Sequence, residues 1–107
     1  MISIRLIEEI NRRLTGNNFG MYRNVSSCLS SYTYYKTKKE QIMSIVLNIL
    51  KGHYFFDGNK RTAFSMFIIL CVHNEIEFSV PLDMAERFVD MARESYTVEE
   101  AVEYIFD

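Results

Sequence analysis

The sequence predicts an all-α protein, for three reasons. Apolar residues recur at helical spacing in several segments, two of these segments begin with a capping box, and almost no stretch alternates as a half-buried strand does. The exception is the stretch 75–80, a candidate for one extended strand. The chain has 107 residues, of which 49% are apolar and one is proline. This is the size of one compact domain, and we expect a single domain over residues 1–107.

The first predicted helix runs from Ser3 to Leu14. Four apolar residues share one of its faces: Ile4, Ile7, Ile10 and Leu14. Gly16 is expected to end this helix. From Asn17 to Lys36 the helical period is lost, and polar residues and tyrosines predominate. We therefore expect a long loop there, with one short helix near Val25 to Ser31.

Two strongly apolar segments follow this loop. Thr37 to Glu40 is a capping box, in which a hydroxyl and a carboxylate satisfy free backbone amides, and an apolar run continues to Gly52. This pattern predicts a helix over residues 38–51. The segment from Ala63 to Val72 is apolar almost all the way around, which is typical of a helix that other helices surround. We expect it to be the central buried helix of a bundle.

Two shorter helices complete the predicted bundle. Pro81 suits the first position of an amphipathic helix that continues to about Arg93. Thr97 to Glu100 is a second capping box, and it precedes an apolar stretch that ends with Phe106.

The composition disfavours several classes of function. Twelve basic and fourteen acidic residues leave a formal charge of −2, which provides no overall attraction to nucleic acid or anionic membranes. We find no signal peptide and no apolar run as long as a membrane span, so we expect a cytoplasmic protein. Cys28 and Cys71 lie far apart without a CxxC motif, and in a reducing compartment we interpret both as core thiols.

Chemically reactive residues gather between the two most apolar segments, where residues 53–63 read HYFFDGNKRTA. The turn from Asp57 to Asn59 leads into the N-terminus of the central helix. Unpaired amides and the positive end of the helix dipole attract anions at such a position. Lys60 and Arg61 add two cations, so the segment predicts a phosphate-binding site.

Two further side chains extend this site. Magnesium that accompanies nucleotide phosphates prefers one or two carboxylates, which makes Asp57 a candidate magnesium ligand. An imidazole such as that of His53 can accept a proton from an attacking hydroxyl at neutral pH. The same residues also fit a structural loop in which Asp57 caps the helix, Gly58 makes the turn and the charges are solvated. Composition alone does not separate these two interpretations.

Residues 53–61 resemble the signature of the Fic/Doc superfamily, HxFx[DE][AG]N[GK]R. The capped helix before the signature, the buried helix after it and the closing pair of short helices resemble the small Doc-type members over most of the chain. The resemblance implies an all-α Fic/Doc-type bundle with its central buried helix directly after the HxFxDGNKR loop. It also implies a protein-modifying transferase, and many such proteins are toxins of toxin–antitoxin pairs.

The resemblance also implies a role for each residue of the signature. His53 is the expected catalytic base for a target hydroxyl, Phe55 the structural anchor of the loop, and Asp57 the ligand of Mg²⁺. Four residues are expected to bind the phosphates of ATP or another nucleoside triphosphate: Gly58, Asn59, Lys60 and Arg61.

The loop over residues 17–36 lies where this family has its flap, a segment that holds the target protein by backbone pairing, and we call these residues the flap. Tyr22, Arg23 and Asn24 suit contact with a target, since tyrosine is favoured at interfaces. The tyrosines of the flap fit equally well as a cover for the core.

Two differences from adenylylating Fic enzymes favour phosphoryl transfer. Lys60 replaces their second glycine and Phe64 their second arginine. Both differences resemble Doc, whose type members transfer the terminal phosphate of ATP to a translation factor. Gly58, which is usual in Fic enzymes, and Tyr54, which replaces a common proline, fit this assignment less well, so transfer of AMP stays an alternative. The sequence has no inhibitory [ST]xxxE[GN] motif, so any restraint would come from a separate antitoxin protein.

Two other interpretations stay open. The chain could be a catalytically silent module that binds a nucleotide or a partner, although the presence of all the signature residues disfavours this. Nucleic-acid binding is supported only by a small basic patch of Lys36, Lys38 and Lys39 near several tyrosines.

Overall fold

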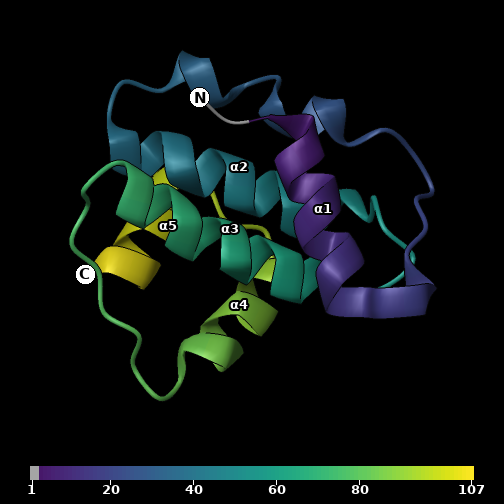
Figure 1. The fold of residues 1–107 in the computed structure, drawn as a ribbon. Helices are drawn as coiled ribbons and strands as arrows, with labels where there is room; N and C mark the ends of the chain where they lie inside the picture. The colour runs from purple at the N-terminus through teal and green to yellow at the C-terminus, as the bar shows by residue number, and fades with distance from the viewer. Residues whose placement is uncertain (1–2) are drawn as a thin grey trace.

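The computed structural model describes residues 3–107 and confirms the all-α fold (Figure 1). Its α-helices are α1 (Ile4–Thr15), α2 (Lys38–Gly52), α3 (Asn59–His73), α4 (Met84–Arg93) and α5 (Val98–Phe106). Short 3₁₀ helices lie between α1 and α2: η1 (Gly16–Asn18), η2 (Val25–Leu29) and η3 (Tyr32–Tyr34). In this part of the chain, no helix is long and apolar enough to cross a membrane.

Most helix ends lie where local sequence signals predict them. Ser3 caps α1 through its side chain, and Gly16 ends α1 with a φ of 59°. Both capping boxes form, at Thr37 for α2 and at Thr97 for α5. The short helix expected near residues 25–31 is present as η2.

Two expectations for the second half of the chain are wrong. Residues 75–80 form no strand, because an extended segment needs a neighbouring strand to pair with and the described chain offers none. Pro81 does not begin a helix. It lies in a turn in which Pro81 O accepts a hydrogen bond from Met84 N (3.0 Å), and α4 starts at Met84.

The helix α3 begins at Asn59, at the end of the turn that was expected to lead into it and four residues before the apolar segment 63–72. Its first turn is polar, so the apolar pattern of the helix does not reveal it. The helix packs against α1, α2 and α4. It shares the centre of the fold with α2, and its outer face is not covered, since Ile69 and Val72 are 36% and 64% exposed.

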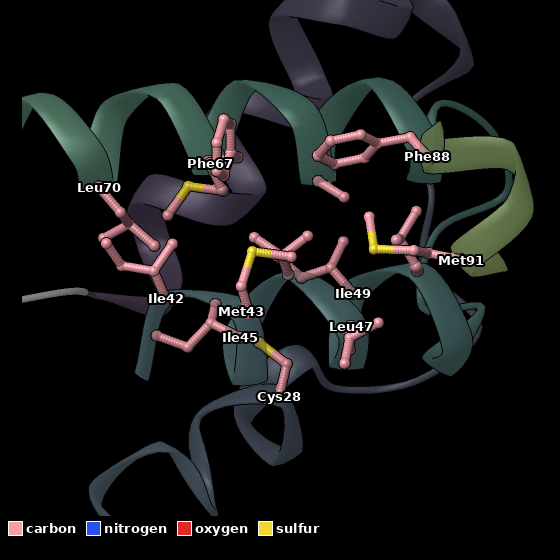
Figure 2. Packing of buried hydrophobic residues seen from close by; sticks show 14 of the residues in the cluster. Cys28, Ile42, Met43, Ile45, Leu47, Ile49, Phe67, Leu70, Phe88 and Met91 are labelled. Carbon is pink, nitrogen blue, oxygen red and sulfur yellow. The ribbon is translucent and has the colours of Figure 1, made fainter. Parts of the chain in front are cut away.

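The core lies mainly between α2 and α3 (Figure 2). Figure 2 shows Met43 of α2 below Phe67 of α3, and Phe88 and Met91 entering the same layer from α4. The rings of Phe67 and Phe88 lie 5.9 Å apart between centroids. Because α3 is held along its length by this layer, its N-terminal end has a fixed position on the surface.

The helix α1 lies across that N-terminal end (Figure 1). The buried residues of α1 are Ile7, Asn11 and Thr15, which follow one another at the i, i+4 spacing of one helix face. Gly58, which precedes α3 with a φ of 75°, lies against this face. A Cβ atom on Gly58 would lie 2.9 Å from Thr15 Cγ2 and 3.2 Å from Asn11 Nδ2. Backbone conformation and packing therefore both favour glycine at this position.

We expect Gly58→Ala to lower the free energy of unfolding by about 1–3 kcal/mol, because alanine adopts positive φ poorly and its methyl group would overlap Thr15. Thr15→Ser removes only Thr15 Cγ2 and keeps the hydroxyl that donates to Asn11 O (2.8 Å). In the Thr15→Ser background, the cost of Gly58→Ala should therefore fall by about 1 kcal/mol. Urea unfolding of the four proteins measures both costs. Equal costs in the two backgrounds would show that Thr15 does not limit this position.

Cys28 and Cys71 are free and buried, as predicted. Burial raises the pKa of each thiol to about 11, so at neutral pH both are protonated and unreactive. We expect a thiol reagent at about pH 8 to modify the native protein slowly and the urea-unfolded protein rapidly, as followed by absorbance. Rapid modification of the native protein would contradict the burial of these thiols.

Candidate functional site

The loop from His53 to Gly58 connects α2 to α3, and its main chain pairs with the flap. Residues Met21 and Phe55 form an isolated antiparallel bridge. Two main-chain hydrogen bonds make this bridge: Tyr22 N donates to Tyr54 O (2.7 Å), and Phe56 N donates to Gly20 O (2.9 Å). The flap groups that face the loop are therefore used within the chain, and a target protein would have to meet other groups of the flap.

Phe55 and Asn59 hold the loop from the inside. The Phe55 ring is 1% exposed, and its centroid lies 6.2 Å from that of Phe19. The Asn59 side chain accepts a hydrogen bond from Phe55 N (3.1 Å) and donates one to Phe55 O (2.9 Å). The loop therefore uses the amide oxygen and one N–H of the Asn59 side chain, which leaves a second side-chain N–H and the main-chain N–H for a phosphate.

The helix α1 reaches the loop through Asn11, a residue that the sequence analysis does not identify. Asn11 Nδ2 donates to Asp57 O (2.8 Å) and to Thr62 Oγ1 (2.9 Å). One feature of the sequence points to this contact. Asn11 and Thr15 are polar but lie on the same face of α1 as the buried Ile7.

His53 and Asp57 lie towards the two ends of the loop, and both side chains are exposed. His53 follows α2 in the left-handed region, with φ 48° and ψ 46°. Such a conformation is uncommon for residues other than glycine and recurs at functional sites. Asp57 Oδ1 accepts a hydrogen bond from Gly58 N (2.8 Å), which keeps the carboxylate beside the start of α3.

The N-terminus of α3 presents unpaired donors and two cations. No side chain caps it. The first hydrogen bond within the helix is donated by Thr62 N to Gly58 O (2.8 Å), so the amides of residues 59–61 have no partner within the helix. Lys60 and Arg61 are both exposed. Arg61 Nη2 lies 3.8 Å from the position that a Cβ atom on Gly58 would take. The helix dipole and these side chains make this surface positive.

Asp57 fits a magnesium ion that is held jointly by the protein and a phosphate ligand. Within residues 3–107, no three His, Cys, Asp or Glu side chains gather as metal ligands. Magnesium commonly binds one or two carboxylates and takes its other ligands from phosphate oxygens and water. An exposed carboxylate beside an uncapped helix N-terminus has the groups that this arrangement needs.

Tyr22, Arg23 and Asn24 lie in the part of the flap that follows the bridge. Tyr22 is 72% exposed, and its ring centroid lies 4.5 Å from that of Phe56, which is 57% exposed. The Arg23 guanidinium lies 4.7 Å from the ring centroid of Tyr54, and the Asn24 side chain caps η2. Tyr22 and Phe56 thus form an exposed aromatic pair next to the loop. Phe56 has no sequence signal of its own, because its partner Tyr22 lies far away in the chain.

Comparison with known proteins places the chain in a family. A model of the Fic/DOC family matches residues 1–71. This match contains α1, the flap, α2, the loop and most of α3, and therefore every residue of the candidate site. No curated protein matches the chain. On the strength of the family match, the chain belongs to the Fic/DOC family, whose members transfer groups onto other proteins.

Proposed function

We propose that this protein-modifying transferase is a Doc-like phosphotransferase, which transfers the terminal phosphate of ATP to a Ser, Thr or Tyr hydroxyl of a target protein. The observation that supports this most is the uncapped start of α3, where Lys60 and Arg61 are exposed beside the carboxylate of Asp57. Anions bind at such helix ends. Phosphoryl transfer depends mostly on positioning and charge stabilisation, which a fixed loop can provide.

In this proposal each site residue has a separate task. The main-chain amides at the start of α3 bind the phosphates together with Lys60 and Arg61, and Gly58 allows the left-handed turn that precedes these amides. Asp57 holds Mg²⁺, which offsets phosphate charge when bound. His53 accepts the proton of the target hydroxyl as the hydroxyl oxygen bonds to the γ-phosphorus. The bond from that phosphorus to the bridging oxygen breaks, and ADP leaves.

The environment of position 64 supports transfer of the γ-phosphate. Phe64 is half-buried, and its ring meets that of Phe88 edge-on with centroids 5.3 Å apart. Position 64 therefore provides no charged group for the β- and γ-phosphates of a nucleotide whose α-phosphate faces His53, which is the orientation for AMP transfer. Lys60 is an exposed point charge that suits a phosphate held further out. The nucleotide would then lie with its terminal phosphate towards His53 and Asp57.

The flap supports the proposed contact with a target protein. Tyr22 is exposed next to the loop, and exposed tyrosines are typical of protein interfaces. The resemblance to Doc adds two further proposals. The target is a translation factor, and the chain is the toxin of a pair whose antitoxin is a separate protein.

We expect Asp57→Asn to weaken the binding of Mg-ATP by about tenfold or more and to leave the binding of ATP in EDTA within about twofold of the parent, since the carboxylate acts through the ion. Asparagine keeps an oxygen that can accept the hydrogen bond from Gly58 N. Calorimetry measures both affinities. The matched control is Asp83→Asn, which changes an exposed carboxylate that precedes α4. Parent-like affinity of Asp57→Asn in both buffers would show that Asp57 holds no metal.

We also expect a γ-label, and no α-label, to appear on a protein band when a bacterial lysate is incubated with the protein and with ATP labelled at one position or the other. His53→Ala should abolish the labelling because the proton acceptor is lost. The control His73→Ala changes the exposed histidine at the end of α3 and should leave the labelling intact. If only the α-label appeared on the protein band, the reaction would be AMP transfer and not phosphoryl transfer. Binding of Mg-ATP without any labelling would favour the silent module.

A further inference from the structure

A buried polar contact links the middle of α1 to both sides of the start of α3. Asn11 is 0% exposed and shares a helix face with Ile7 and Thr15. Its amide nitrogen donates to the carbonyl of Asp57 (2.8 Å) and to the hydroxyl of Thr62 (2.9 Å), which is also 0% exposed. One amide group therefore joins the end of the loop to the first turns of α3.

Stabilisation of the fold alone does not explain this contact well. Asn11 Oδ1 is buried without a hydrogen-bond partner in the described part of the chain, and leaving a buried polar atom unpaired lowers stability. Replacing buried polar partners by apolar groups of similar shape is often neutral or stabilising. Locally unfavourable features of this kind are expected mainly at functional sites.

The position of the contact indicates which function it serves. Each residue from Tyr54 to Asp57 has a main-chain group in a hydrogen bond. The flap binds Tyr54 O and Phe56 N, Asn59 binds Phe55 on both sides, and Asn11 binds Asp57 O. Asn11 thus fixes the last peptide group of the loop, on the residue whose carboxylate is exposed beside α3.

We propose that Asn11 is a positioning residue for the transfer reaction. By holding the carbonyl of Asp57, Asn11 fixes the orientation in which the Asp57 carboxylate binds the metal–nucleotide complex. This inference rests on the proposed role of Asp57 as a metal ligand. A ligand group that is already ordered before binding avoids the entropy cost of ordering it, so the loss of Asn11 should lower the affinity for the metal complex.

The test compares two variants that share one lost hydrogen bond. Asn11→Leu is similar in size and removes the bonds to both Asp57 and Thr62. Thr62→Val also removes the bond between Asn11 and Thr62, but it keeps the bond from Asn11 to the Asp57 carbonyl. Asn11→Ser, a smaller polar change, replaces Asn11→Leu if that variant does not fold. Thermal unfolding monitors stability, and calorimetry below the unfolding transition measures the affinity for Mg-ATP and for ATP in EDTA.

We expect Asn11→Leu to weaken binding of Mg-ATP by about tenfold and binding of ATP in EDTA by less than about twofold, whereas Thr62→Val changes both by less than about twofold. Hydrogen exchange should become faster at the amides of residues 56–58 in Asn11→Leu and stay unchanged in α5. These readouts separate positioning from stability, because both variants lose a buried hydrogen bond.

Two results would overturn the proposal in distinguishable ways. If Asn11→Leu unfolds at a lower temperature but binds Mg-ATP as the parent does, Asn11 is only structural and the proposed function is unaffected. If the parent itself binds ATP equally with and without magnesium, the metal-binding role of Asp57 fails, and the role of Asn11 fails with it.

Discussion

The candidate site depends on the hydrogen bonds that fix the main chain of residues 54–57. Phe55 buries its ring in the hydrophobic core, near that of Phe19, and this draws the neighbouring peptide groups away from water. Buried peptide groups have to be paired, and a short loop cannot pair them internally. The partners come from three separate parts of the chain: Gly20 and Tyr22 of the flap, Asn59 of α3, and Asn11 of α1. The shape of the loop therefore depends on the packing of α1, the flap and α3 around it.

Two left-handed residues and one tyrosine adapt the chain to this shape. His53 and Gly58 both have positive φ, at 48° and 75°, and they mark the two ends of the loop. The ring of Tyr54 lies over Gly52, where a Cβ atom would come within 2.1 Å of a ring carbon. The Tyr54 hydroxyl is hydrogen-bonded to Ser27 Oγ (2.6 Å). Tyr54, which occupies the position of a common proline in the family signature, thus ties the loop to η2.

Local sequence signals, which act between residues close together in the chain, predicted most of the fold. The capping boxes at Thr37 and Thr97 and the glycine after α1 act through contacts within a few residues, so their helices began or ended as expected. The start of α3 was predicted from the turn at residues 57–59 and not from the apolar pattern, because the first turn of the helix carries the polar residues of the site. The helix start predicted at Pro81 was wrong because proline is as compatible with a turn before a helix as with the first helical position.

The site was predictable only in part, for a related reason. The resemblance to the family signature identified the residues of the loop, all of which lie in one short stretch of sequence. Asn11 and Phe56 were missed because their roles arise from contacts between segments that are distant in the chain. The structure also gives Asn59 a second role. Its side chain serves the loop, a use that the sequence pattern could not distinguish from phosphate binding.

We propose that the fold prepares the loop for the terminal phosphate of a nucleotide before any ligand binds. A crystal structure of the protein with Mg²⁺ and a non-hydrolysable ATP analogue tests this claim most directly. We expect the terminal phosphate to lie at the N-terminus of α3, between Asp57 and His53, and the main chain of residues 54–57 to move by less than about 1 Å. A nucleotide bound elsewhere, or a loop that releases its bonds to Asn11 and the flap, would contradict this claim.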